Sequence, residues 1–167
     1  MTWVLILSEL AVFGAGLLAF LAMRPVDPTG LAEAQSHLHR TGAASNTLVL
    51  ATSGWLAALA LGAAEAGQTR RLRLLLAPAL LLGAVFLILK GREYADLFAQ
   101  GIGTETHAFH AFSLLLTGFH AARVLAGMAL LAIVGWLATP KAVEAAATFW
   151  RMVDLVWVLL FPVVYLL

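Results

Sequence analysis

Ionisable side chains interrupt stretches of this sequence that are otherwise almost entirely apolar. Glu9, Arg123, Arg151 and Asp154 all stand inside long hydrophobic runs. A charge at the centre of a membrane helix costs about 2.5 to 3.5 kcal/mol on the insertion scale, so it is retained for a structural or functional reason. We expect these two acids and two bases to converge in a helical bundle as ion pairs. Arg151 and Asp154, at i and i+3, are close enough to pair directly.

A second group of charges closes the third apolar run of the sequence. It consists of Lys90, Arg92, Glu93 and Asp96 and is formally neutral. We expect internal ion pairs that hold helices together, because an unpaired charge in lipid is costly. The functional alternative for both groups is a path for protons or ions, which uses the same residue types.

The five histidines form no pattern that would hold haem or a metal ion. His120 stands alone inside an apolar run, so we expect a hydrogen-bonded packing residue. A bis-histidine haem needs two imidazoles at matched depth on facing helices. The other four histidines fall in polar segments or at a run's end, and are expected at the surface: His37, His39, His107 and His110. Cysteine is absent, and no catalytic, cofactor-binding or metal-binding residue is predicted.

The composition indicates which elements must position these residues. Of 167 residues, 62% are hydrophobic and 11% are charged, whereas soluble domains average about 45 to 50% and about 25%. A water-soluble globule is therefore excluded, and a formal charge of +1 leaves no basic surface for nucleic acid. Five spans of about 20 residues fit this length with little left for a soluble domain.

Five apolar runs predict one all-α domain over residues 1–167, an integral membrane five-helix bundle. The first run lacks a preceding basic segment and is too long for a leader, so we expect a retained helix. Small residues recur at every fourth position in several runs, as at Gly54, Ala58 and Gly62, and predict close helix packing. The expected spans are approximately 3–23, 45–65, 72–98, 107–138 and 143–167.

Basic residues are unevenly distributed between the two sides that five spans define. Three arginines between positions 70 and 73, together with Lys141, fall on the side of the N-terminus. Only Arg24 and Arg40 fall on the opposite side. Because cytoplasmic loops are enriched in Lys and Arg, we expect the N-terminus inside the cell and the C-terminus outside.

Five short motifs, one in each run, resemble those of a known family. They are Ser8-Glu9 in LILSELAVF, Asn46 and Ser53 in SNTLVLATSGW, Lys90, Glu93 and Tyr94 in LKGREY, Thr117, Gly118, His120 and Gly127 in LLLTGFHAARVLAG, and Trp150, Asp154, Trp157, Pro162 and Tyr165 in FWRMVDLVWVLLFPVVYLL. In this order they resemble subunit III of haem-copper oxidases. Within that family they are most similar to the short nitric oxide reductase E-type proteins.

The resemblance implies a non-catalytic membrane subunit or accessory protein of the bacterial inner membrane, with its C-terminus in the periplasm. Its partner would be the catalytic subunit of a haem-copper oxidase or nitric oxide reductase, which holds the haem and metal of the respiratory complex. This chain would bind phospholipid but no haem or metal, and would support assembly, stability or sustained turnover. The family form has seven helices, and this chain is similar to five of them, without the first two.

The resemblance also implies limits on function. The family usually has histidines where Arg123 and Arg151 stand, so a pH-sensing role cannot be carried over. The alternative is a small transporter or proton channel built around Glu9, Asp154 and His120, although no internal repeat or broken helix supports it. Whether the partner reduces oxygen or nitric oxide stays open. Candidate residues for structural, proton-related or lipid-related roles are Glu9, Asn46, Lys90, Glu93, His120, Arg123, Arg151 and Asp154.

Overall fold

The protein is an all-α bundle, as predicted. The computed structural model describes residues 2–23, 40–101 and 108–166, and leaves some side chains of the first helix, Glu9 among them, outside the description. Five α-helices and a terminal π-helical turn make up the described chain. They are α1 (Thr2–Met23), α3 (Arg40–Glu65), α4 (Thr69–Ala99), α5 (Ala108–Leu137), α6 (Pro140–Phe161) and η1 (Pro162–Leu166).

Several helices extend beyond the apolar runs that predict them. α3 begins at Arg40 and α4 begins at Thr69. The first turn of each helix therefore includes polar residues that precede the apolar run. The 31 residues of α4 rise about 46 Å, whereas the hydrocarbon core is about 30 Å thick. An apolar run therefore marks the part of a helix inside the hydrocarbon, while the helix continues into the polar interface.

Prolines set the ends of α6. Pro140 occupies the first turn, where its missing N–H costs nothing. Ala138, the first residue after α5, has a φ of 54°. At the other end Pro162 cannot donate to the preceding turn, and the chain continues as the wider π-helical turn η1.

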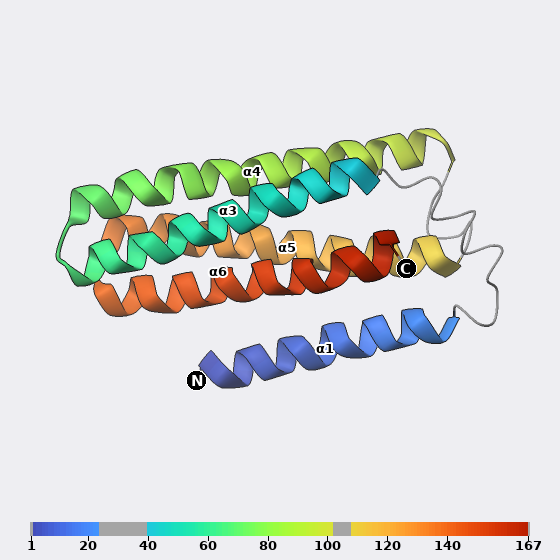
Figure 1. Ribbon diagram of the computed structural model, residues 1–167, viewed down its shortest axis with the longest axis horizontal. Coiled ribbons are helices and arrows are strands. Elements are labelled where there is room, and N and C mark those ends of the chain that lie inside the picture. Colours follow the sequence, from blue (N-terminus) through green and yellow to red (C-terminus); the bar gives the residue numbers. More distant parts are fainter. Residues whose placement is uncertain (1, 24–39, 102–107, 167) are drawn as a thin grey trace.

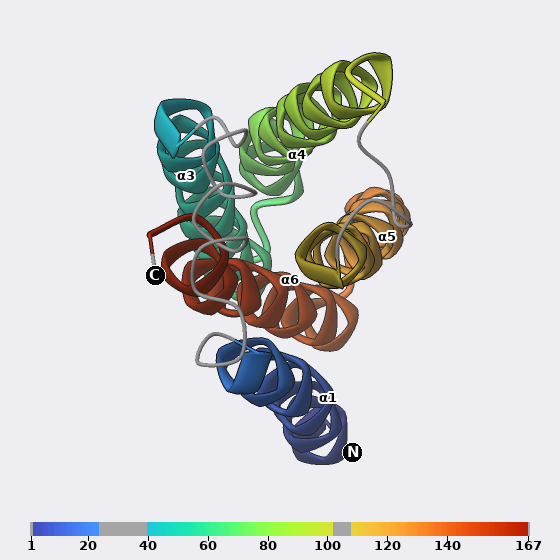
Figure 2. The same ribbon diagram turned by 90° about the vertical axis from the view of Figure 1, so that its right-hand side faces the viewer.

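Successive helices run in opposite directions along the long axis of the bundle (Figure 1). The end-on view places α6 centrally, with α1 below it, α3 and α5 on either side, and α4 above it between α3 and α5 (Figure 2). Among the described helices, α1 packs mainly against α6 and α5. Within the residues that the structure describes, the four helices from α3 to α6 are long and apolar enough to cross a membrane, so the chain is a multi-pass membrane protein.

Helices pack closely at Gly54, Gly83 and Gly127, of which only Gly54 belongs to the small-residue stripes. A Cβ on Gly127 would lie 2.6 Å from the Trp150 ring, and one on Gly83 would lie 3.0 Å from the same ring. Gly54 lies directly beneath the Asp154 carboxylate, whereas Gly62, in the same stripe, is exposed. The fourth-position spacing therefore predicted close contact at Gly54 but was wrong at Gly62.

Candidate functional site

Lys90 forms the centre of a closed polar cluster where α4 meets the C-terminal turn η1. The Lys90 side chain is only 3% exposed, and its Nζ lies 2.7 Å from Glu93 Oε2. Nζ also donates to the Tyr165 hydroxyl, which in turn donates to Glu93 Oε1 at 2.8 Å. Both oxygens of the carboxylate are thus occupied. The predicted internal ion pair is present, and Tyr165 is a member that the sequence did not reveal.

Aromatic rings complete the surroundings of the Lys90 ammonium group. Nζ lies 4.9 Å from the ring centroids of both Trp157 and Tyr165, within range of cation–π attraction. The other two charges of this sequence cluster, Arg92 and Asp96, are exposed and do not join it. The Lys90 cluster therefore joins α4 to α6 and η1 through a buried ammonium group whose charge Glu93 neutralises.

His120 lies in an aromatic enclosure beside this cluster. Its ring is fully buried, with ring centroids 5.1 Å from Trp157 and 5.7 Å from Phe86. Neither ring nitrogen has a hydrogen-bond partner among the described residues. The prediction of a packing residue is correct, but the prediction that it is hydrogen-bonded is wrong, because three rings, including that of Phe13, surround it.

The remaining histidines and acids do not assemble a metal site within the part of the chain that the structure describes. His110 is 6% exposed, so its expected surface position is wrong: it lies in the first turns of α5, facing the bundle. His37, His39 and His107 lie outside the described residues.

Polar side chains of α3 form a series of contacts that the sequence did not predict. Trp150 Nε1 donates to Ser53 Oγ at 3.1 Å, and Ser53 donates to the Ala79 carbonyl at 2.7 Å. About two helical turns further along α6, Trp157 Nε1 donates to Thr47 Oγ1 at 3.0 Å. α6 is thereby joined to α3, and through Ser53 to α4. Indole donors separated from their acceptors by about a hundred residues leave no periodic signal.

Asn46 is next to Thr47 on α3, and only part of its hydrogen-bonding capacity is satisfied. It is 2% exposed, and its Nδ2 donates to the Phe86 carbonyl at 3.4 Å. Its Oδ1 has no hydrogen-bond partner in the described helices. The residue lines the cavity described below.

Arg151 does not join the other charges that were expected to converge with it in the bundle. Asp154 turns toward α3 and lies over Gly54, while the Arg123 guanidinium lies over the Phe119 ring, 4.4 Å from its centroid. Arg151 is exposed on the outer face of α6, and no ion pair joins it to Asp154. Residues three apart on a helix differ by about 60° in direction, enough to place one inside and one outside. The Glu9 side chain lies outside the description, so its convergence with Arg123 stays a prediction.

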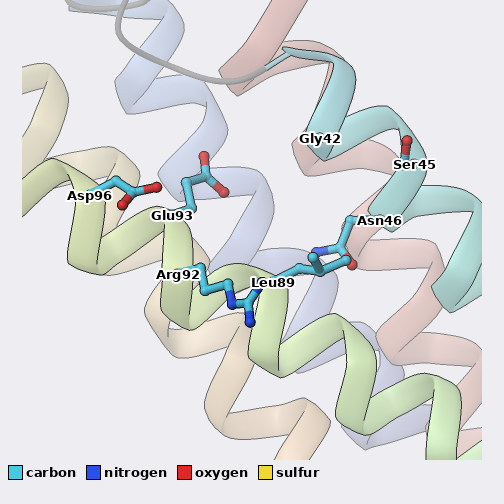
Figure 3. Close-up of a pocket in the computed structure, with 7 residues that line it drawn as sticks. All are labelled: Gly42, Ser45, Asn46, Leu89, Arg92, Glu93 and Asp96. Atoms are coloured by element: carbon cyan, nitrogen blue, oxygen red, sulfur yellow. The ribbon is translucent and has the colours of Figure 1, made fainter.

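A half-open cavity of about 370 Å³ lies between α3 and α4 near the ends of both helices. Figure 3 shows Asn46 and Leu89 pointing toward one another across it, with Glu93 and Asp96 projecting from α4. The lining combines a guanidinium, two carboxylates and a buried amide with apolar surface. Its residues are Gly42, Ser45, Asn46, Leu89, Arg92, Glu93 and Asp96.

Comparison with known proteins shows that this chain is similar to the members of one protein family. The family model of cytochrome c oxidase subunit III matches residues 3–167. The chain is 32% identical to cytochrome c oxidase subunit 3 of Corynebacterium diphtheriae, over 97% of this chain and 84% of that protein. It is 30% identical to the probable cytochrome c oxidase subunit 3 of Mycobacterium leprae, over 95% and 83%. It is also 34% identical to cytochrome bo(3) ubiquinol oxidase subunit 3 of Pseudomonas putida, over 55% of this chain and 48% of that protein.

Proposed function

Because the chain belongs to the cytochrome c oxidase subunit III family, we propose that it is a membrane subunit of a haem-copper oxidase without catalysis of its own. The match over residues 3–167 is the observation that carries this proposal. The resemblance to subunit III predicted from the five motifs is confirmed. The relatives named above are subunits of oxidases, which favours an oxidase as the partner of this chain.

The finer part of the proposal concerns the identity of the partner and the way in which this chain supports it. We propose that the chain supports assembly, stability or sustained turnover of the catalytic subunit, which carries the haem and metal. The resemblance to nitric oxide reductase E-type proteins that we infer from the five sequence motifs makes nitric oxide reductase the second candidate partner. The enclosed polar contacts around Lys90 and Trp150 support a structural role, because their hydrogen-bonding groups are directed at one another.

Phospholipid is the proposed ligand of this chain, and the cavity between α3 and α4 is the proposed place for a headgroup. Arg92 suits a phosphate, while Asp96 and the Asn46 Oδ1 suit an ammonium group. Arg92 lies seven residues before the end of α4, about 10 Å along its axis, close to the level at which lipid headgroups begin. A zwitterionic headgroup would therefore meet both signs of charge there.

The proposal predicts that the tagged chain co-purifies in mild detergent with a haem-containing membrane subunit, and with phospholipid detectable by mass spectrometry. Deleting the chain should lower the level or sustained activity of that enzyme at least twofold. The proposal would be refuted if the oxidases and reductases of the deletion strain kept the abundance and activity that they have in the parent strain. Proton flux through liposomes that contain the chain alone would instead favour the channel built on Glu9, Asp154 and His120.

The basic residues at one end of the bundle support a proposal for the membrane orientation. Arg73, on the turn side of α4, donates to the Gly135 carbonyl at 3.1 Å, so the charged starts of α4 and α6 lie at the same end. We propose that this end is cytoplasmic, which places the C-terminus in the periplasm. In this cysteine-free chain, an impermeant maleimide should label Gln100→Cys in cells with a permeabilised outer membrane, and Arg71→Cys only after cell lysis. The reverse pattern would contradict the orientation.

A further inference from the structure

Arg151 stands out among the charges that the described helices expose. The other exposed charges lie toward helix ends: Glu65, Arg70, Arg71, Arg73, Arg92, Asp96, Lys141 and Glu144. Arg151 lies eleven residues after Pro140 and fifteen before Leu166, about 16 Å and about 22 Å along the helix axis. With a hydrocarbon core about 30 Å thick, this exposed guanidinium is near the middle of the membrane.

No group on its own chain is placed to neutralise it in the described part of the protein. Asp154, the nearest acid on α6, is directed toward Gly54 of α3, where a side chain of any size would displace it. Glu144, the next exposed acid, is seven residues away, about 10 Å along the axis. Charged side chains inside a membrane are normally paired or face a polar environment.

The residues beside Arg151 form an apolar stripe suited to another helix. Leu155 and Val158, at i+4 and i+7, are 51% and 50% exposed, and Pro162 continues the same line. The opposite side of α6 is buried in the bundle through Trp150, Trp157 and Leu160. We call the surface of Arg151, Leu155 and Val158 the Arg151 face.

We propose that the Arg151 face binds a transmembrane helix of the partner subunit that presents an aspartate or glutamate at mid-membrane depth. The inference rests on the proposed function, since it identifies the surface through which this chain meets its partner. Charge complementarity selects the occupant: the pair would bring a carboxylate and a guanidinium out of lipid together, in a geometry that can be bidentate. A helix without an acid would leave the guanidinium unpaired in the interface.

The first experiment compares substitutions in the tagged chain, purified from cells with its partner in mild detergent. Arg151→Leu should reduce the co-purified partner at least tenfold, whereas Arg151→Lys, which keeps the charge, should retain most of it. Lys141→Leu, which removes an exposed cation at the start of the same helix, should leave the yield unchanged. The isolated Arg151→Leu chain should unfold at the same temperature as wild type or higher, because a lipid-facing charge has been removed. Loss of stability would instead show an internal structural role and overturn the proposal.

The second experiment locates the contact directly. Because the chain has no cysteine, Leu155→Cys and Leu81→Cys each provide one site for a photo-cross-linker, and both leucines are exposed near mid-helix. Cross-links to the partner should form from position 155 and not from position 81 on α4. An Arg151→Leu yield equal to wild type, or cross-links from 155 only to lipid or to a second copy, would overturn the proposed face. If wild type brings down no partner, the proposed function itself fails.

Discussion

Glu93→Leu is expected to lower the free energy of unfolding by about 3 to 5 kcal/mol, more than other single substitutions of charged residues in the described helices. Its carboxylate holds Lys90 and Tyr165, and Lys90 is almost completely inaccessible. Removing one partner of a buried pair leaves the other charge uncompensated, which is far costlier than removing both. The double variant Lys90→Leu with Glu93→Leu should therefore recover at least half of the loss.

Reversible unfolding of the purified chain in mixed detergent micelles would measure both changes. Asp96→Leu is the matched control, because this carboxylate is on the same helix but exposed. It should change the free energy of unfolding by no more than about 0.5 kcal/mol. A double variant as unstable as the sum of its single variants would show that Lys90 and Glu93 act independently.

Trp150→Ala is expected to cost about 3 to 5 kcal/mol of unfolding free energy, because a fully buried indole leaves a large cavity. The loss also removes the hydrogen bond from Nε1 to Ser53. Trp136→Ala provides the matched control, since that ring is 83% exposed. Similar unfolding free energies for the two alanine variants would contradict the packing described for Trp150.

Gly127 offers an independent check of the same contact. A Cβ there would lie 2.6 Å from the Trp150 ring, so Gly127→Ala should cost about 1 to 3 kcal/mol in the wild-type background. In the Trp150→Ala background the cavity accepts the extra methyl group, and most of the cost should vanish, since only Phe149, 3.3 Å away, remains close. The coupling free energy of this double-mutant cycle measures how tightly α5 and α6 are packed.

Hydrophobic run length was sufficient to predict the fold, because twenty apolar residues in succession have few alternatives to a membrane helix. The Lys90–Glu93 pair could also be predicted from the sequence, since spacing of i and i+3 brings the two groups to neighbouring positions. The same spacing failed for Arg151 and Asp154. What separates the two cases is the neighbour: Gly54 leaves room for Asp154 against α3, and this contact depends on residues a hundred positions apart.

Ring contacts were the least predictable part of the candidate site. Tyr165 and Trp157 contribute to the surroundings of Lys90 from the far end of the sequence, and their apolar neighbours give no hint of which ring turns inward. His120 illustrates the reverse problem. An imidazole among apolar residues suggested a hydrogen bond, yet Phe86 and Trp157 occupy the space around it.

The order of synthesis on the ribosome bears on how α6 enters the membrane. A helix with two charged residues near its middle inserts only marginally by itself. Chains grow from the N-terminus at about 5 to 20 residues per second, so α3 and α5 precede α6 by seconds. The short turn between Leu137 and Pro140 then delivers α6 beside α5, where Gly54 of α3 already offers a place for the Asp154 carboxylate. The helices made first thereby give α6 a protein surface to pack against, so that the Asp154 side chain enters the bundle and not the lipid.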